Sequence, residues 1–254
     1  MKTQLMKKEI LGVGVTDATE ENILEYVVDF IENEKGQLFI TTPNPEILVY
    51  ATHHQRFADI LTSAHISLPD GVGVVVAGAI LGKTLKSRIT GVDFMKNLCE
   101  KVSTRPITVG FLGGKGDVAL KASECLKSTF PTLQILLAEA GNPDDFTAKN
   151  IQKRFAKDQR PVTIDILFVG FGFPKQEEWI HAHLQELPVR VAMTVGGSFD
   201  IVSGSLPRAP RLMRNIGLEW LWRLFLQPSR WKRQIKLVEF VWLVLKEKFK
   251  IASN

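Results

Sequence analysis

The sequence contains very little cysteine and no long hydrophobic run. Its 254 residues include two cysteines, Cys99 and Cys125, which are too few for a disulfide framework and form no CxxC metal site. The apolar run at 10–15 is too short for the core of a signal peptide, and no stretch reaches the ~20 apolar residues needed to span a bilayer. We therefore expect a protein that is made and kept in the reducing cytoplasm.

Two motifs of nucleotide-dependent enzymes are also absent. The sequence has no G-x-x-x-x-G-K-[ST], which excludes a P-loop, and no D-x-D pair, so the metal–diphosphate clamp of many sugar transferases is missing. His181 and His183 form an H-x-H pair in a helical pattern, where they point to different faces, so we expect no metal site there. The sequence therefore predicts no metal cofactor.

The positive charge of the chain is concentrated at its C-terminal end. The formal net charge is +5, but the segment 207–254 holds eleven Lys and Arg residues against three Glu, so the rest of the chain is slightly acidic. The same segment carries four of the five tryptophans. A basic, aromatic end predicts an anionic partner such as a phosphate, a nucleic acid or a lipid headgroup.

Strand and helix patterns alternate over the first 205 residues. Continuous apolar runs predict buried strands at 10–15, 38–41, 65–68, 107–112, 133–138, 164–169 and 189–195. Helical patterns lie at 19–33, after Asn44 and Pro45 (a predicted N-cap and first helical residue), and near 92–102, 116–129, 145–157 and 174–186. This order predicts an α/β fold with a Rossmann-like parallel sheet flanked by helices.

The character of the chain changes near Ser205. The segment 207–210 is typical of a linker, and helical patterns follow at about 211–226 and 229–250, separated by Pro228. We therefore divide the chain into a Rossmann-like core, residues 1–205, and a helical, basic and aromatic C-terminal appendage, residues 206–254. Basic amphipathic helices of this kind lie in membrane interfaces. The alternative is that they are ordinary helices packed on the core.

Several predicted strands end in glycine-rich turns. These turns contain the pairs Gly113 and Gly114, Gly170 and Gly172, and Gly196 and Gly197. Glycine lets backbone N–H groups approach a phosphate at a helix N-terminus, and ligands of parallel sheets bind at the carboxyl ends of the strands. Three such turns in one sheet favour a nucleotide site.

The first of these turns also fits a different class of enzyme. The segment 114–119 matches G-x-G-x-x-A, and Glu139 follows Ala119 by twenty residues, at a predicted strand end. This is a dinucleotide fingerprint with its ribose-binding acid. An NAD(P)-dependent oxidoreductase is therefore the alternative at this point.

Polar side chains follow two of the predicted strands. Thr42 and Asn44 end one strand, and Asp70 follows another. Because the carboxyl ends of parallel strands share one edge of the sheet, these side chains would converge on one crevice. Arg88, in a polar stretch, and Gln176, at a helix start, are further candidates. Each residue also has an ordinary interpretation as a turn residue, a solvated charge or a helix cap.

Taken in order, these motifs resemble the WecG/TagA/CpsF glycosyltransferase family. The matching segments of the core are TTPNPE at 41–46, LPDGVG at 68–73, RITG at 88–91, GFGFPKQE at 170–177 and VGGSFD at 195–200. RAP at 208–210, LEW at 218–220, Arg223 and PSRWKR at 228–233 resemble the family's C-terminal appendage. The resemblance covers nearly the whole chain. One departure is Phe173, where a small residue is commoner.

The resemblance implies an inverting transfer of one sugar from a UDP-sugar to an undecaprenyl-diphosphate-linked sugar. In the teichoic-acid branch the donor is UDP-N-acetylmannosamine and the acceptor is N-acetylglucosaminyl-diphospho-undecaprenol. Other branches use mannosaminuronic acid, glucose or glucuronic acid donors for enterobacterial antigen, capsule or exopolysaccharide. Glycine turns that hold the diphosphate of NAD would serve UDP equally well, so the resemblance favours the transferase over the oxidoreductase.

Matched by position, the resemblance implies a role for each candidate residue. Asp70 takes the place of the general base, with Thr42 and Arg88 as further catalytic residues. The residues expected to bind the sugar and the diphosphate of the donor are Asn44, Gln176, Gly113, Gly114, Gly172, Gly196, Gly197 and Asp200. The appendage arginines expected to meet the lipid diphosphate are Arg223, Arg230 and Arg233.

These inferences also predict the partners and location of the protein. We expect a UDP-sugar donor, a lipid-linked acceptor and an anionic membrane surface, with peripheral attachment to the inner face of the cell membrane. We expect no nucleic acid, because the apolar stretch at 237–245 would not contact a phosphate backbone. The oligomeric state stays open, homo-oligomers included.

Overall fold

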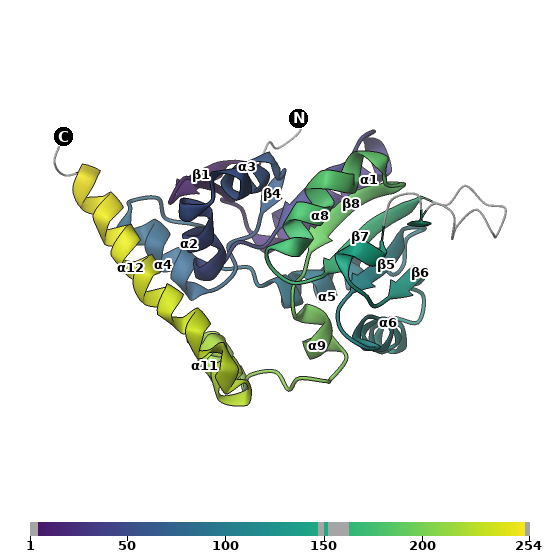
Figure 1. The fold of residues 1–254 in the computed structure, drawn as a ribbon. Helices are drawn as coiled ribbons and strands as arrows, with labels where there is room; N and C mark the ends of the chain where they lie inside the picture. The colour runs from purple at the N-terminus through teal and green to yellow at the C-terminus, as the bar shows by residue number, and fades with distance from the viewer. Residues whose placement is uncertain (1–4, 147–149, 152–162, 252–254) are drawn as a thin grey trace.

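The structure, a computed structural model, describes residues 5–146, 150–151 and 163–251. Its centre is a sheet of six strands in the order β4-β3-β8-β7-β5-β6, and every neighbouring pair is parallel. The strands are β3 (Leu38–Thr41), β4 (Ile66–Ser67), β5 (Thr108–Gly113), β6 (Gln134–Glu139), β7 (Ile164–Gly170) and β8 (Val189–Thr194). This confirms the predicted α/β fold with a Rossmann-like parallel sheet (Figure 1).

Helices connect the strands and cover the sheet. They are α1 (Glu20–Asn33), α2 (Pro45–His53), α3 (Gln55–Ser63), α4 (Val72–Ile80), α5 (Gly91–Val102), α6 (Val118–Thr129), η1 (Pro143–Asp145), α8 (Lys175–His183), η2 (Leu184–Glu186) and α9 (Ser198–Val202). Helices α3 and α4 have no counterpart among the predicted helices. The helix predicted at 145–157 lies mostly outside the described residues.

The prediction of one strand at 10–15 is wrong, because this segment is part of a hairpin. Strands β1 (Lys7–Ile10) and β2 (Val13–Thr16) pair antiparallel, with Ile10 opposite Val13. Between them, Leu11 and Gly12 have φ values of 50° and 78°. This backbone is a two-residue turn with positive φ at both positions. A leucine rarely adopts positive φ, so the apolar run conceals the turn.

The sheet is buried on both faces, which explains its continuous apolar strands. On one face, Phe111 and Phe168 pack with apolar residues of α1, α5 and α6. On the other face, Phe39 and Leu167 pack with residues of α3 and α8, among them Trp179. Strand side chains thus alternate between two cores, and the polar residues that could bind a ligand are left at the strand ends.

The C-terminal helices are α10 (Arg211–Asn215), α11 (Glu219–Leu226), η3 (Pro228–Arg230) and α12 (Trp231–Ile251). The predicted helix at 211–226 is therefore two helices, separated by Gly217, whose φ is 78°. A Cβ atom at Gly217 would lie 2.6 Å from Val72 Cβ, so this turn packs closely on the start of α4. Among the described residues, no helix is long and apolar enough to cross a membrane.

Helix α12 runs across α2 and α4 (Figure 1). Phe240 and Val244 are buried in a core that α12 shares with both helices. A hydrogen bond and an ion pair flank this contact: His53 Nε2 lies 2.5 Å from Glu239 Oε1, and Lys83 Nζ lies 3.2 Å from Glu247 Oε1. At least this part of the appendage therefore shares a hydrophobic core with residues 1–205.

We expect Phe240→Ala to destabilise the whole protein. Phe240 is 3% exposed, and emptying such a site costs about 3–5 kcal/mol of unfolding free energy. Val238→Ala is the matched control, because Val238 on the same helix is 72% exposed and should change stability by less than about 0.5 kcal/mol. Both values are measured by denaturant unfolding. A loss limited to a separate transition would show that residues 206–254 unfold as an independent unit.

Candidate active site

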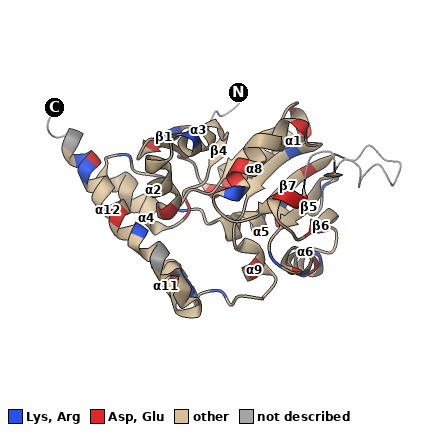
Figure 2. Ribbon diagram, viewed as in Figure 1, with Lys and Arg blue, Asp and Glu red and all other residues tan. Residues whose placement is uncertain are grey.

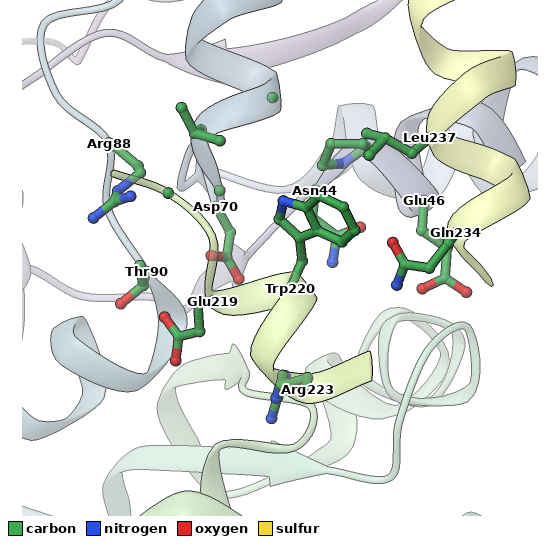
Figure 3. Close-up of a pocket in the computed structure, with 15 residues that line it drawn as sticks. Asn44, Glu46, Asp70, Arg88, Thr90, Glu219, Trp220, Arg223, Gln234 and Leu237 are labelled. Carbon is green, nitrogen blue, oxygen red and sulfur yellow. The ribbon is translucent and has the colours of Figure 1, made fainter. Parts of the chain in front are cut away.

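The carboxyl ends of the parallel strands face two adjoining cavities. The larger, of about 510 Å³, lies over the glycine turns after β5, β7 and β8, and the smaller, of about 260 Å³, lies between the start of α4 and helices α11 and α12. The two cavities share six lining residues, which are Asn44, Glu46, Asp70, Thr90, Glu219 and Arg223. They therefore form one cleft in two parts that meet around Asp70 (Figure 3).

The glycine turns line the larger cavity, as predicted for Gly114, Gly172, Gly196 and Gly197. The first three have φ values of 82°, 81° and 51°, a conformation that favours glycine. Asp200, in α9, lines the same cavity. The remaining predicted glycine is not among the lining residues of either cavity.

That residue, Gly113, has a packing role at the end of β5. A Cβ atom there would lie 2.7 Å from the ring of Phe171 and 2.9 Å from the backbone of Gly170. Its φ of 103° is also unfavourable for any other residue. Gly113 therefore allows the ends of β5 and β7 to approach each other.

Asp70 lies at the junction of the two cavities, between β4 and α4. Its backbone N–H donates to the Pro43 carbonyl at 3.1 Å, and the Gly91 N–H donates to its carboxylate. Burial raises the pKa of Asp70 to about 7, against the opposing charge of Arg223. A carboxyl group that titrates near neutral pH is suited to general-base catalysis.

Thr42 and Asn44 follow β3 and line the larger cavity, as their positions predict. Thr42 is buried, with its hydroxyl 3.5 Å from the Thr194 carbonyl oxygen. The Asn44 side chain accepts a hydrogen bond from the Ile47 N–H at 3.1 Å, and Pro45 is the first residue of α2. This confirms the predicted N-cap and fixes Asn44 at the edge of the cleft.

Gln176 is buried under the turn after β8 and does not cap α8, which begins after Pro174 without a side-chain cap. Its Oε1 accepts from the Gly196 N–H at 3.0 Å, and its Nε2 donates to Glu177 Oε1 at 2.8 Å. Burial raises the pKa of Glu177 to about 7. Gln176 thus holds the Gly196 turn in place, and Glu177 orients the Gln176 amide.

Two of the predicted arginines lie at the cleft. Arg88 lines the smaller cavity, and Arg223, on α11, lines both. Arg223 Nη2 donates to the Gly197 carbonyl at 3.2 Å, while its Nε is buried with no hydrogen-bond partner in the described part of the chain. Arg230 and Arg233 stand in η3 and α12, but their side chains lie outside the described part of the structure.

The cleft also contains residues that the sequence analysis did not select. They include Glu46, Thr90, Glu219, Trp220 and Gln234. In Figure 3 the side chains of Glu219 and Trp220 lie around the same opening as Asp70. Thr90, Glu219 and Trp220 stand inside the matched segments RITG and LEW, so the resemblance contained a signal for them.

The two histidines of the H-x-H pair have different surroundings. His181 Nδ1 lies 3.2 Å from the Ser63 hydroxyl, whereas the ring of His183 lies 5.3 Å from that of Trp179. Within the described residues, no three His, Cys, Asp or Glu side chains come close enough together to hold a metal ion.

Comparison with known proteins identifies the family of this chain. The model of the glycosyl transferase WecG/TagA/CpsF family matches residues 8–254. The chain belongs to this family. It is 38% identical to the N-acetylglucosaminyldiphosphoundecaprenol N-acetyl-beta-D-mannosaminyltransferase of Bacillus spizizenii, over 85% of this chain and 82% of the relative. Enzymes with the same name from Bacillus subtilis and Staphylococcus aureus are 34% and 33% identical, over 96% and 98% of this chain and 93% and 96% of their own lengths.

Membership of the WecG/TagA/CpsF family makes this protein a glycosyltransferase and rules against the NAD(P)-dependent oxidoreductase. The structure also explains why that alternative fits the sequence. Gly114 follows β5, α6 begins at Val118, and Glu139 ends the adjacent strand β6. A dinucleotide-binding fold has the same arrangement, and both ligand classes contain a diphosphate.

We expect Asp70 to reduce the stability of the folded protein as the pH rises. Its ordinary pKa is 3.8 and its pKa in the folded state is about 7, so the folded state binds the proton more tightly. The unfolding free energy should therefore fall between about pH 4 and pH 7 and then level off. Asp70→Asn removes this term, so the variant should exceed the parent by at least about 1 kcal/mol at pH 8.

The measurement is denaturant unfolding of both proteins at pH 4, 6 and 8. The advantage of Asp70→Asn should shrink towards pH 4, where the parent carboxyl is protonated in both states. An advantage that is independent of pH would contradict the raised pKa.

Proposed function

We propose that this enzyme transfers N-acetylmannosamine from UDP-N-acetylmannosamine to N-acetylglucosaminyl-diphospho-undecaprenol, with inversion, in the synthesis of teichoic acid or another surface polysaccharide. The names of the relatives from Bacillus and Staphylococcus support this reaction. The observation that carries it is the two-part cleft with Asp70 at its junction. A donor with mannosaminuronic acid, glucose or glucuronic acid is the alternative within the same family.

The larger cavity suits the donor. Its glycine turns present backbone to the cleft at Gly114, Gly172 and Gly196, where a diphosphate can approach closely. Arg223 adds a positive charge at the side nearest Asp70. The sugar of a donor whose diphosphate lies over these turns would therefore reach the junction of the cavities.

The smaller cavity suits the acceptor. Arg88, Trp220 and Leu237 line it but do not line the larger cavity. An indole ring packs against the apolar face of a sugar, and arginine binds phosphate oxygens in a bidentate manner. The cavity lies under α11 and α12, so a lipid chain attached to the acceptor could leave along these helices.

In the proposed reaction, the Asp70 carboxylate takes the proton of the acceptor hydroxyl. The hydroxyl oxygen forms a bond with the anomeric carbon of the donor, and the bond from that carbon to the diphosphate breaks on the opposite side. UDP leaves with the bonding electron pair. Arg223 and the backbone N–H groups of the glycine turns would stabilise the charge that develops on it.

We further propose that no metal ion takes part in the transfer. The positive groups at the cleft, which include Arg88, Lys115 and Arg223, are placed to balance the diphosphate charge that a metal balances in enzymes with a D-x-D pair. Turnover should therefore persist in EDTA. A loss on chelation that Mg²⁺ or Mn²⁺ restores would contradict the proposal.

Turnover assays with a panel of UDP-sugars and one lipid-linked N-acetylglucosamine acceptor test the reaction. We expect product with UDP-N-acetylmannosamine. Asp70→Asn should bind UDP normally but lose at least ~10²-fold in kcat, whereas Asp59→Asn, on the exposed surface of α3, should keep parental turnover. In the parent, kcat/KM should fall as the pH drops below about 7, because the base must be ionised.

The outcomes of this assay separate the alternatives. Turnover with another UDP-sugar alone would assign that donor and reject N-acetylmannosamine. Near-parental turnover of Asp70→Asn would leave Asp70 as a turn residue. No product with any UDP-sugar would reject the proposed reaction as a whole.

We also propose that the appendage lies on an anionic membrane surface. On α12, the side opposite the buried Phe240 and Val244 exposes Val238, Val241 and Trp242. Figure 2 marks the charged positions along the α12 ribbon, and uncharged positions lie between them. Further exposed apolar side chains of the appendage are Leu212, Ile216, Phe225, Leu226, Trp231, Ile235 and Leu245. Apolar area beside basic residues is the property of interfacial helices.

Sedimentation with vesicles that contain phosphatidylglycerol tests this surface. Replacing Val238, Val241 and Trp242 by serine should abolish co-sedimentation, since these side chains are 72%, 50% and 58% exposed. Transfer to a short-chain, water-soluble acceptor should persist. Serine at Leu120 and Leu136, exposed apolar positions of α6 and β6, is the control and should sediment like the parent. The proposal would be contradicted if the parent protein did not sediment with the vesicles.

A further inference from the structure

The linker between core and appendage is fixed to the core at several points. The Leu206 N–H donates to the Asp200 carbonyl at 2.8 Å, and Trp222 Nε1 donates to the Pro207 carbonyl at 3.1 Å. Ala209 is 3% exposed. Between these points stands Arg208, whose guanidinium group faces two carboxylates.

Arg208 binds two carboxylates that belong to different parts of the protein. Its Nη1 donates to Asp93 Oδ1 and its Nη2 donates to Asp93 Oδ2, each at 2.6 Å. Asp93 stands in the first turn of α5. Its Nε lies 3.6 Å from Glu219 Oε1, at the first residue of α11. Arg208 therefore links a core helix directly to the appendage helix that carries Arg223.

Both ends of this link lead to Asp70. Asp93 also accepts from the Thr90 hydroxyl at 2.7 Å. Gly91, which follows Thr90 in the chain, donates its backbone N–H to the Asp70 carboxylate. At the other end, Glu219 and Arg223 stand one helical turn apart on α11 and line both cavities. The contacts thus run from the Thr90–Gly91 segment beside Asp70 through Asp93 and Arg208 to α11, whose Glu219 and Arg223 line the junction of the cleft.

We propose that Arg208 is a positioning residue that sets α11 on the core, so that Arg223 and Glu219 lie beside Asp70. Arg208 is not among the lining residues of either cavity, so it acts through α11 and not on the substrate. This inference rests on the proposed roles of Asp70 and Arg223. An arginine suits this position because its planar fork binds Asp93 with two nitrogens. Its Nε donates no hydrogen bond within the described residues but lies at ion-pair distance from Glu219, and a lysine has no such third nitrogen.

A double-mutant cycle between Arg208 and Arg223 tests the inference. Arg208→Met keeps most of the side-chain volume and removes the charge, and we expect it to lower kcat/KM by about 10–100-fold through misplacement of α11. In an Arg223→Ala background the same change should have little further effect, because the group that Arg208 positions is already gone. Arg208→Lys should recover only part of the loss.

Hydrogen exchange supplies a readout that does not depend on turnover. In Arg208→Met, the amides of α11 should exchange at least 10-fold faster than in the parent, while those of α5 beyond its first turn should not change. The control is Arg105→Met, which removes a pair of Arg105 with Glu32 at the core surface and should alter neither exchange in α11 nor kcat/KM.

The outcomes separate this inference from the proposed function. Faster exchange in α11 without turnover in the parent would reject the reaction but keep the positioning role. The positioning role would be overturned, while the reaction stands, if the α11 amides of Arg208→Met exchanged at the parental rate. It would also be overturned if the fold-losses in kcat/KM of Arg208→Met and Arg223→Ala multiplied in the double variant.

Discussion

The structure depends on keeping one carboxyl group, that of Asp70, partly out of water at the point where two cavities meet. Burial opposes its ionisation and Arg223 favours it, so its pKa comes to about 7. Neither effect is local in sequence. The parallel sheet brings the end of β4 next to the end of β3, with β8 on the other side of β3, and the appendage brings α11 over them. The raised pKa of Asp70 therefore requires that the core and the appendage pack together.

On the other side of the cleft, the Gln176–Glu177 pair fixes the backbone of a glycine turn. The Gly196 turn has no side chain to hold it, and the Gly196 N–H donates instead to the side-chain Oε1 of Gln176. The Gln176 amide is in turn fixed by a fully buried carboxyl group, Glu177. A site that binds phosphate through backbone needs such support, because a mobile turn would lose binding free energy to conformational entropy.

The sequence predicts the sheet well because strands buried on both faces are continuous apolar runs, as in β7 and β8. It fails where one apolar run hides a turn, as at Leu11 and Gly12, and where the apolar helix α4 lacks polar periodicity. The residues at the strand ends, Thr42, Asn44 and Asp70, were predictable because parallel topology places them at one edge. Glu219 and Trp220 were not selected, although they stand in the matched segment LEW, because local sequence does not show that packing of the appendage carries them to that edge.

Helix α12 of the appendage has apolar residues on two sides, one buried and one exposed. Phe240 and Val244, one turn apart, anchor α12 in the core, while Val238, Val241 and Trp242 point outward. A helix buried on one side and apolar on the other is poorly stabilised in water alone, since exposed apolar area of this extent usually has a partner. In the proposed membrane-bound state, the same two-sided helix would fix the orientation of the cleft relative to the bilayer. The smaller cavity, lined by Gln234 and Leu237 of α12, would then open next to the lipid surface from which the acceptor arrives.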